Sequence, residues 1–293
     1  MARWLHSVRV MHLAFRIVSP CVLWMLVGCA TFDVQQSSLV PAATPPPPAS
    51  FDRVADVYAA DTTVVFLDEP ERSPNETAGL WIPRHQIDGA IGVRFGRYMG
   101  MQLTYRQGLS AGAMRAAPTT LRNPGRDVRA AGIGMSFRVP LGDEPLELHV
   151  SWHNALVQVP SHVEATCVSF CGAPGSTTVR DEVDGVLMLS AGASLQWSFD
   201  EAGRGWLGLV GQTHPTNQER FASGDTDAEV EMGPLNLLAS IGVEIELVEG
   251  FSVIPQLQVP ITARPVRYGP ILGLGLRGSF GSEVDPARRR GAK

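Results

Sequence analysis

The stretch Leu187–Phe199, "LMLSAGASLQWSF", alternates between two kinds of residue with a period of two. Its odd positions carry Leu, Leu, Ala, Ala, Leu, Trp and Phe, whereas its even positions from Ser190 onward carry Ser, Gly or Gln. A period of two is that of a β-strand, in which successive side chains point to opposite faces. The 13-residue run exceeds a mean soluble strand of about 5–6 residues and covers a membrane strand of about 9–11. The stretch therefore predicts a long strand with one apolar and one small, polar face.

The same period recurs along the chain from about residue 60 onward. Leu235–Leu247 repeats it most clearly, with Leu238 as the exception on its polar face. Short links near 96–98, 142–145, 200–204 and 248–250 alternate with longer ones near 68–85, 108–128, 159–184, 214–233 and 262–267. The ten predicted strands cover residues 62–68, 86–96, 98–107, 129–141, 145–158, 185–199, 205–213, 234–247, 251–261 and 269–280. This pattern predicts an all-β fold, an antiparallel up-and-down barrel of about ten strands with both chain ends at the short-link side.

The polar face decides between a membrane-spanning barrel and a soluble β-barrel or sandwich, because period two fits both. That face is mostly Gly, Ser and Gln, with the charged residues Arg94, Arg106, Arg138, Glu147, Glu244 and Arg277. Small residues with paired charges suit the interior of a narrow barrel, and ten strands are too few for a wide water channel. We expect a membrane-spanning barrel whose short links are periplasmic. A soluble barrel with its apolar faces inward is the alternative.

Aromatic residues are also placed as in outer-membrane barrels. Six flank the proposed periplasmic turns or the chain exit: Phe95, Tyr98, Phe199, Trp206, Phe251 and Phe280. They resemble the aromatic girdles of that class. The final run "PILGLGLRGSF" resembles the closing strand of such barrels, although thirteen residues follow it. The resemblance implies a bacterial outer-membrane location.

The N-terminus has the features of a secretory signal. Arg3, Arg9 and Arg16 precede a short apolar run that ends on Gly28, too short to span a bilayer as a helix. The sequence Leu26-Val27-Gly28-Cys29 resembles the lipobox of bacterial lipoproteins. That resemblance implies cleavage before Cys29, a lipid on its thiol and an acyl chain such as palmitate on the new amino terminus. A plain signal cleaved elsewhere is the alternative, and translation could begin at Met1 or Met11.

These features divide the chain into four parts. Residues 1–28 are the signal, 29–50 a lipidated N-terminus with a proline-rich linker, 51–281 the barrel and 282–293 a basic tail. Four consecutive prolines, Pro45–Pro48, favour a semi-rigid spacer of the polyproline type. Removal of the signal takes the formal net charge from −5 to about −8, which argues against a nucleic-acid partner. The expected partners are outer-membrane lipid and an unidentified surface or periplasmic component.

Two cysteines and an acidic run lie in the longer links. Cys167 and Cys171 predict a disulfide, with two free thiols, or a metal site with His162, as alternatives. Asp225, Asp227, Glu229 and Glu231 alternate in "SGDTDAEVE", but the spacing lacks the features of an EF-hand and predicts a solvated loop. Arg288–Arg290 predict a solvated tail. We expect no metal ion and no cofactor.

One pair of residues allows a catalytic hypothesis. His149 and Ser151 in "ELHVSWHN" share a strand face, and a hydroxyl beside an imidazole can form a nucleophile. The pair resembles the His-x-Ser of outer-membrane lipid A deacylases, whose site faces lipid, whereas the register here points both residues inward. His153 lies about 13 Å from His149 along the strand, too far to share a metal ion. We therefore expect no enzyme.

The sequence accordingly predicts a structural or surface-interaction protein, an outer-membrane β-barrel lipoprotein that displays long outer loops. A lipid-anchored periplasmic barrel that binds a small apolar ligand, and a lipid-modifying hydrolase, are the alternatives.

Overall fold

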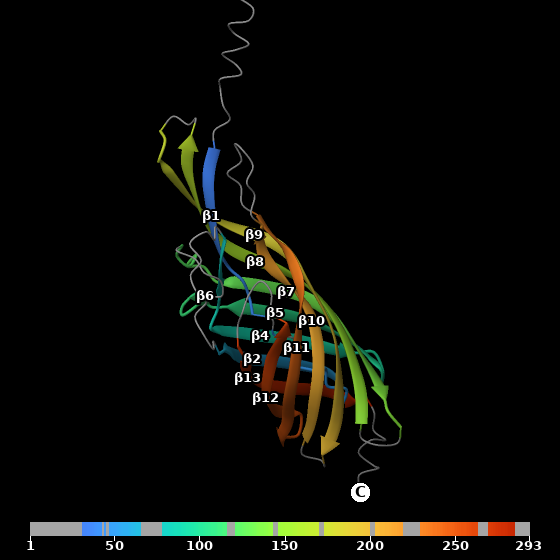
Figure 1. Ribbon diagram of the computed structural model, residues 1–293. Helices are drawn as coiled ribbons and strands as arrows, with labels where there is room; N and C mark the ends of the chain where they lie inside the picture. The colour runs from blue at the N-terminus through green and yellow to red at the C-terminus, as the bar shows by residue number, and fades with distance from the viewer. Residues whose placement is uncertain are drawn as a thin grey trace, which may run out of the picture. The chain divides into compact units, whose positions relative to one another are not determined.

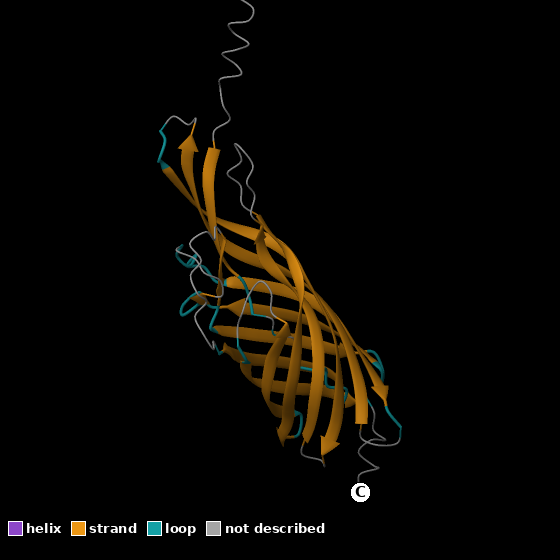
Figure 2. Ribbon diagram, in the orientation of Figure 1, coloured by secondary structure: helices purple, strands orange, loops and turns teal. Residues whose placement is uncertain are grey.

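The computed structural model describes residues 31–42, 44, 47–65, 78–115, 121–142, 146–169, 173–199, 203–218, 229–262 and 269–284. They form strands without helices (Figure 2). The strands are β1 (Thr31–Leu39), β2 (Arg53–Val64), β3 (Ala78–Ile82), β4 (His85–Arg94), β5 (Met99–Gly108), β6 (Met114–Arg115), β7 (Val128–Pro140), β8 (Leu146–Ser169), β9 (Thr177–Phe199), β10 (Gly203–Gln218), β11 (Glu229–Val248), β12 (Phe251–Thr262) and β13 (Ile271–Glu283). Among the described residues no helix is long and apolar enough to cross a membrane.

Ten of these strands close into an antiparallel barrel. Their order is β8-β7-β5-β4-β2-β13-β12-β11-β10-β9, and β9 pairs back with β8 (Figure 1). Neighbours along the chain pair as hairpins, such as β4 with β5 from Gln86↔Gly108 to Arg94↔Gly100. The first and last strands of the barrel, β2 and β13, pair with each other from Ile271↔Val64 to Phe280↔Ala55. The predicted all-β antiparallel barrel of about ten strands is confirmed.

The two ends of the barrel differ in the length of their connections. At one end the links Phe95–Tyr98, Leu141–Pro145, 200–202 and Glu249–Gly250 are short, and we call it the short-turn end. Gly96, Gly142 and Gly250 there have positive φ values of 81°, 77° and 77°, a backbone conformation that glycine adopts without the steric penalty of a Cβ. The other connections, which include 65–84 and 109–127, define the long-loop end.

The first barrel strand differs from its prediction. It was expected at 62–68, but β2 begins at Arg53, so that Asp56, Tyr58 and Thr62 are buried on its inner face while Val57 is exposed. The alternation was present in "DVYAADTTV", but Ala55, Ala59 and Ala60 weaken its apolar contrast. Strands β8 to β11 also extend further at the long-loop end than predicted.

Three short strands extend the sheet beyond β8. β1 pairs in parallel with β3, from Gln36↔Ala78 to Leu39↔Trp81, and β3 pairs with β6. None of the three was predicted. β3 and β6 are only five and two residues long, and β1, of nine residues, lies where a linker was expected.

A small second unit contains the described residues 31–34, 164–169 and 173–179. Its hairpin tip is closed by backbone bonds from Cys167 N to Ser176 O (2.9 Å) and from Gly175 N to Cys167 O (2.8 Å). The hydroxyls of Thr166 and Thr177 lie 3.0 Å apart across the same hairpin.

Candidate functional site: a chain segment inside the barrel

The described residues between Pro41 and Ser50 lie inside the barrel. Pro41, Ala42, Thr44, Pro47, Ala49 and Ser50 are all buried. We call Gln35–Ser50 the lumen segment. The described part of the segment that was predicted to be a semi-rigid, proline-rich spacer thus lies within the barrel. The reason is chemical complementarity with the barrel wall, which the sequence pattern alone does not reveal.

Proline-rich backbone presents carbonyl oxygens but few N–H groups, because proline has no N–H and polyproline conformations make no internal hydrogen bonds. Arginine is the matching partner, since its guanidinium has five donors and no acceptor. Four arginines of the barrel wall reach the lumen segment: Arg94, Arg106, Arg204 and Arg277.

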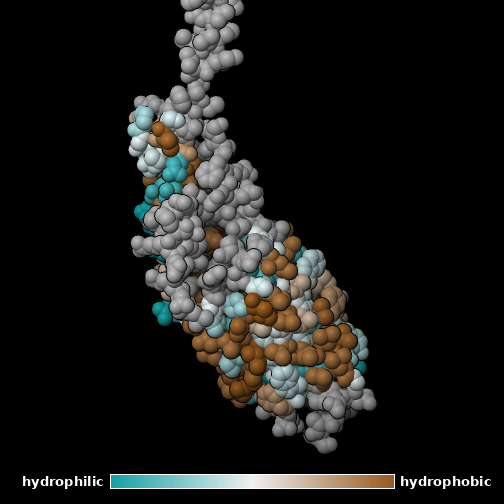
Figure 3. Space-filling model, viewed as in Figure 1, coloured by the Kyte–Doolittle hydropathy of each residue, from teal (hydrophilic) through white to brown (hydrophobic). Residues whose placement is uncertain are grey.

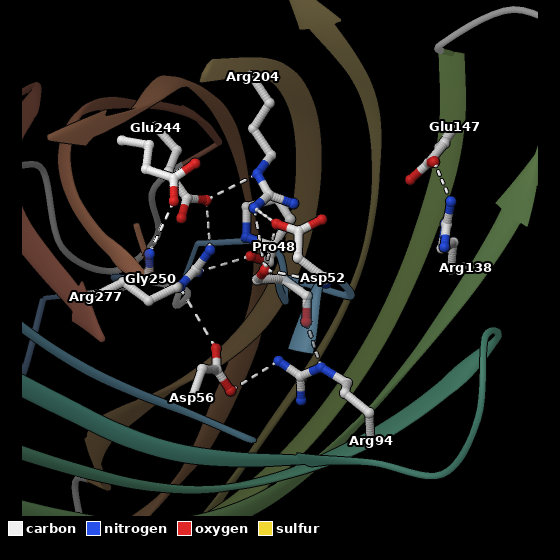
Figure 4. Close-up of polar contacts among 12 residues, drawn as sticks. Pro48, Asp52, Asp56, Arg94, Arg138, Glu147, Arg204, Glu244, Gly250 and Arg277 are labelled. Atoms are coloured by element: carbon white, nitrogen blue, oxygen red, sulfur yellow. Dashed lines mark hydrogen bonds and ion pairs between the residues drawn. The ribbon is translucent and has the colours of Figure 1, made fainter. Parts of the chain in front are cut away.

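Three of these arginines lie at the short-turn end in an ionic group that is buried except for Asp52. We call it the basal cluster: Asp52, Asp56, Arg94, Arg204, Glu244 and Arg277 (Figure 4). Arg277 Nη1 lies 2.6 Å from Glu244 Oε2, and its Nε lies 3.4 Å from Asp56 Oδ2. Arg94 Nη2 lies 2.8 Å from the other oxygen of Asp56. The Arg94 and Arg277 side chains are 1% and 3% exposed, so that each charge is compensated within the barrel.

The basal cluster also binds the lumen segment. Arg277 donates to Pro48 O (2.9 Å), Arg94 Nε donates to Ser50 O, and Arg204 donates to Ser50 Oγ (3.0 Å). Phe51 follows directly, with the Arg94 guanidinium 5.1 Å from its ring centroid. The cluster therefore fixes the point at which the segment turns into β2.

A second ion pair holds the middle of the segment. Arg106 Nε lies 2.5 Å from Asp88 Oδ1, while its terminal nitrogens donate to Ala42 O (3.3 Å) and Thr44 O. Gln86 contacts the same two residues, accepting from Ala42 N at 2.9 Å. Beside them a cavity of about 40 Å³, lined by Tyr58, Asp88, Arg106 and His153 among others, leaves room for little more than water.

Apolar packing holds the segment at the long-loop end. Leu39 and Val40 are fully buried in a cluster that includes Val64, Ile82, Val128, Val157, Leu238 and Ile271. Polar bonds flank this packing, because Ser38 Oγ lies 2.7 Å from Ser161 Oγ and His214 Nε2 lies 2.9 Å from Pro41 O. The segment is thus bound along its length, by charge at one end and by apolar contact at the other.

The charged residues predicted for the barrel interior are confirmed there. Arg138 pairs with Glu147 at 2.5 Å, in addition to the pairs already described. Asp52, Asp56, Asp88 and Arg204 were missed. Asp56 and Asp88 have the period-two signal of inner positions, whereas Asp52 and Arg204 lie at strand ends, where no periodicity marks them.

His149, Ser151 and His153 lie on the same strand, β8, as predicted. His149 is buried, its Nε2 lies 3.1 Å from Glu147 Oε2, and its ring packs edge-on against Phe51 at 5.5 Å. His153 Nε2 contacts Gln102 Nε2. These histidines therefore contact interior side chains, and His149 also contacts Phe51, the residue that follows the lumen segment.

The outer wall carries the apolar faces of the strands. Every barrel strand exposes large apolar residues, among them Val57, Ile91, Leu103, Ile133, Trp152, Leu195, Leu207, Ile241, Val259 and Leu274. On the face that Figure 3 shows, hydrophobic residues gather over the barrel. Five of the six predicted girdle aromatics are exposed near the short-turn end: Phe95, Tyr98, Phe199, Phe251 and Phe280. Trp206 is the exception. It is 3% exposed and occupies the interior opposite Gly242, whose missing side chain makes room for the indole.

Several predicted sites fall on residues outside the described ranges. Cys29, Cys171, Asp225, Asp227 and Arg288–Arg290 are among them, and the side chains of Glu229 and Glu231 are not described either. Cys167 is buried in β8, and its pairing with Cys171 stays a prediction. Within the described ranges no group of three or more His, Cys, Asp or Glu side chains is placed to hold a metal ion.

Comparison with known proteins gives likeness in structure alone. No family model matches the chain, and no curated protein does. An outer-membrane channel from Pseudomonas putida F1 aligns with 81% of this chain and 100% of its own, at 9% identity and a TM-score of 0.40. The translocator domain of the autotransporter NalP from Neisseria meningitidis covers 79% and 90% (10% identity, TM-score 0.36), and LpxR from Salmonella typhimurium 77% and 100% (7%, 0.35). Likeness at these scores assigns no function to the chain.

Proposed function

We propose that this protein is a bacterial outer-membrane β-barrel whose lumen is closed by its own N-terminal segment, with a structural or surface-interaction role carried by its long connections. The observation that carries the proposal is the lumen segment itself, bound by four arginines. A general porin needs an open aqueous path, whereas the described interior here is occupied by the lumen segment and the side chains that bind it.

The membrane-spanning part of the proposal rests on the direction of the side chains. Soluble monomers rarely expose continuous apolar patches larger than a few hundred Å², but here apolar residues face outward on all ten strands. The interior carries the buried ion pairs instead, which is the inverse of a soluble barrel built around an apolar ligand. This arrangement favours the outer-membrane proposal over the anchored ligand-binding barrel.

A lipid-modifying activity has weaker support. A hydrolase acting on membrane lipid needs its nucleophile at the outer face, whereas His149 is buried in the interior and bonded to Glu147. We therefore propose no catalytic role for His149 and Ser151. Replacement of Ser151 by Ala is expected to leave the lipid A acylation pattern of the cells unchanged, as judged by mass spectrometry.

Conductance measurement tests the closed lumen. The purified full-length protein, reconstituted in planar bilayers, is expected to give no steady conductance above the bilayer baseline. A porin reconstituted in the same way is the positive control. Stable, long-lived channel openings by the full-length protein would overturn the proposal.

Membrane insertion is tested with a variant that carries no acyl chain. Residues 1–29 are replaced by an ordinary cleavable signal, so that Cys29 and any acyl chain on it are absent. We expect the product to resist a urea wash of isolated outer membranes, because the strands themselves span the bilayer. A product that washes off soluble and folded would show that the apolar wall is not in lipid.

Acylation at Cys29 is the remaining part of the proposal, and the lipobox supports it. Cells grown with labelled palmitate should incorporate label into the native chain. The variant of the preceding experiment is the matched control and should carry none. Absence of label from the native chain would leave the barrel proposal intact and remove the anchor.

A further inference from the structure

The contacts of the lumen segment fix the direction in which it crosses the barrel. Ser50 is bound at the short-turn end by Arg94, the last residue of β4. Ala42 is bound by Gln86, the second residue of β4, and Val40 N donates to Trp81 O of β3, which precedes β4 (2.9 Å). From residue 50 back to residue 40 of the lumen segment, the bonded partner on the barrel therefore moves steadily from the short-turn end to the long-loop end.

Chain length agrees with a complete crossing. Residues 42–50 span eight steps, as do their β4 partners 86–94. Polyproline rises about 3.1 Å and a β-strand about 3.3 Å per residue, so both cover roughly 25 Å. That distance is about the height of the apolar band of an outer-membrane barrel. The segment is thus extended through the lumen, parallel to β4.

The segment continues beyond the lumen among the long connections. Gln36 pairs with Ala78 of β3, and its Nε2 donates to Ser161 Oγ at 3.3 Å. Ser37 Oγ donates to the carbonyl of Arg122 in the connection before β7, at 2.9 Å. Gln35 is therefore at the long-loop end, opposite to the end where β2 begins.

We infer that the chain enters the barrel from the cell-surface side, so that residues before Gln35 are presented outside the cell and any acyl chain on Cys29 inserts into the outer leaflet. The inference rests on the proposed membrane-spanning barrel with periplasmic short turns. It replaces the expectation that both chain ends lie in the periplasm.

Reach limits the position of the lipid. Gln35 is six residue steps after Cys29, and six steps of fully extended chain span at most about 22 Å. The hydrocarbon core is about 30 Å thick. The lumen segment, as far as its residues are described, already lies along the path through the barrel, so that the chain before Gln35 does not reach the periplasmic leaflet. An acyl chain on Cys29 therefore inserts among the lipids of the outer leaflet.

Cysteine labelling on intact cells tests the direction. Three single variants are compared, with the wild-type protein as background for the native cysteines: Asp33→Cys before the lumen segment, Arg126→Cys in the connection before β7, and Glu249→Cys in a short turn. A membrane-impermeant maleimide is expected to label Asp33→Cys and Arg126→Cys on intact cells, at least tenfold above background. Glu249→Cys should be labelled only after the outer membrane is permeabilised.

The outcomes separate the two proposals. If Asp33→Cys behaves like Glu249→Cys while Arg126→Cys is labelled on intact cells, the inference is overturned and the membrane barrel stands. If Arg126→Cys and Glu249→Cys behave alike, the membrane-spanning barrel itself is wrong. Accessibility is read on the native full-length chain in each case, so that folding of a fragment is not required.

The position of the lipid has its own test. A specific protease site is inserted after Asp33 in the palmitate-labelled chain, and intact cells are treated with the protease. We expect the label to leave the barrel band while the barrel stays in the membrane. Retention of the label on an uncut barrel, with cleavage after permeabilisation, would place the anchor on the periplasmic side.

Discussion

At the scale of single residues, the interior is fitted so closely that small residues are structural requirements. Gly242 on β11 faces Trp206 on β10, and a Cβ at Gly242 would overlap the indole ring. Glycine is usually a weak strand former, but here it makes the space that a large interior side chain occupies. The space at Gly242 explains why Trp206, which was predicted for the outer girdle, lies inside the barrel.

Replacement of Gly242 by Ala should therefore destabilise the barrel by overpacking, typically by about 1–3 kcal/mol. The measurement is the temperature at which the unheated, compact form is lost on a gel. Gly185→Ala is the matched control, because a Cβ at Gly185 would meet its nearest neighbour, Leu156 Cδ1, at an ordinary 3.9 Å. Equal stability of the two variants would contradict the packing argument.

Asp127 allows a pH-dependent prediction outside the membrane. Burial raises the pKa of its carboxyl, but bonds from Ser110 N and Gln107 Nε2, both 2.8 Å, outweigh burial and hold the pKa below its ordinary value. A pKa that is lowered in the folded state contributes stability above the unfolded pKa of about 3.9. That stability is lost as the pH falls from there through the lower folded pKa. The hydrogen-exchange protection of Ser110 N–H should therefore be constant near neutrality and decline below about pH 4.

Asp127→Asn is the control for this titration. Its amide oxygen still accepts the Ser110 bond but cannot be protonated in this range. The protection of Ser110 should then lose its acid dependence. A decline that persists in Asp127→Asn would assign the effect to another group.

At the scale of elements, the lumen segment and the barrel wall stabilise each other through shared charges. Arg106 bridges Asp88 of β4 to two carbonyls of the segment. Removing one partner of a buried ion pair leaves an uncompensated charge and costs about 3–5 kcal/mol, whereas replacing both partners by apolar residues is often close to neutral.

We accordingly expect Arg106→Met to destabilise the protein strongly and the double variant Asp88→Leu/Arg106→Met to recover part of that loss. The double variant still lacks the bonds from Arg106 to Ala42 and Thr44, so recovery should be incomplete. Urea unfolding of the purified barrel in detergent gives the comparison. A double variant less stable than Arg106→Met would show that the charge balance is not the main effect.

The elements also show what the sequence can predict. Alternation predicted nine strands, five of them within three residues of their observed bounds, because a polar inner face and an apolar outer face produce a period of two. It underestimated β8 to β11 at the long-loop end. It misplaced β2, where alanines blur the contrast. It could not place the lumen segment, because a chain surrounded by protein on all sides has no periodicity. The carbonyls that bind Arg94 and Arg277 belong to the backbone and leave no trace in residue identity.

At the scale of the whole molecule, closure of the barrel and placement of the N-terminal chain are one event. The segment is bound at both ends of the lumen and joins β2 through Phe51 without a free linker, so it has to lie inside when β13 pairs with β2. Loss of the segment would leave Arg94 and Arg277 without their backbone acceptors, Arg204 without the Ser50 hydroxyl, and the lumen open to water.

A variant that lacks residues 31–50, with its signal replaced by a cleavable one, makes the consequence measurable. If it folds, water replaces the missing carbonyls, and planar bilayers should show steady conductance where the full-length chain shows none. Its urea midpoint should fall, because the buried contacts of Leu39 and Val40, each about 1.5–3 kcal/mol, are lost. Full-length protein cross-linked through Ser38→Cys and Ser161→Cys, whose parent hydroxyls lie 2.7 Å apart, is the matched closed form. If the shortened chain folds as stably as the full chain and gives no conductance, the lumen segment neither stabilises the barrel nor closes its lumen.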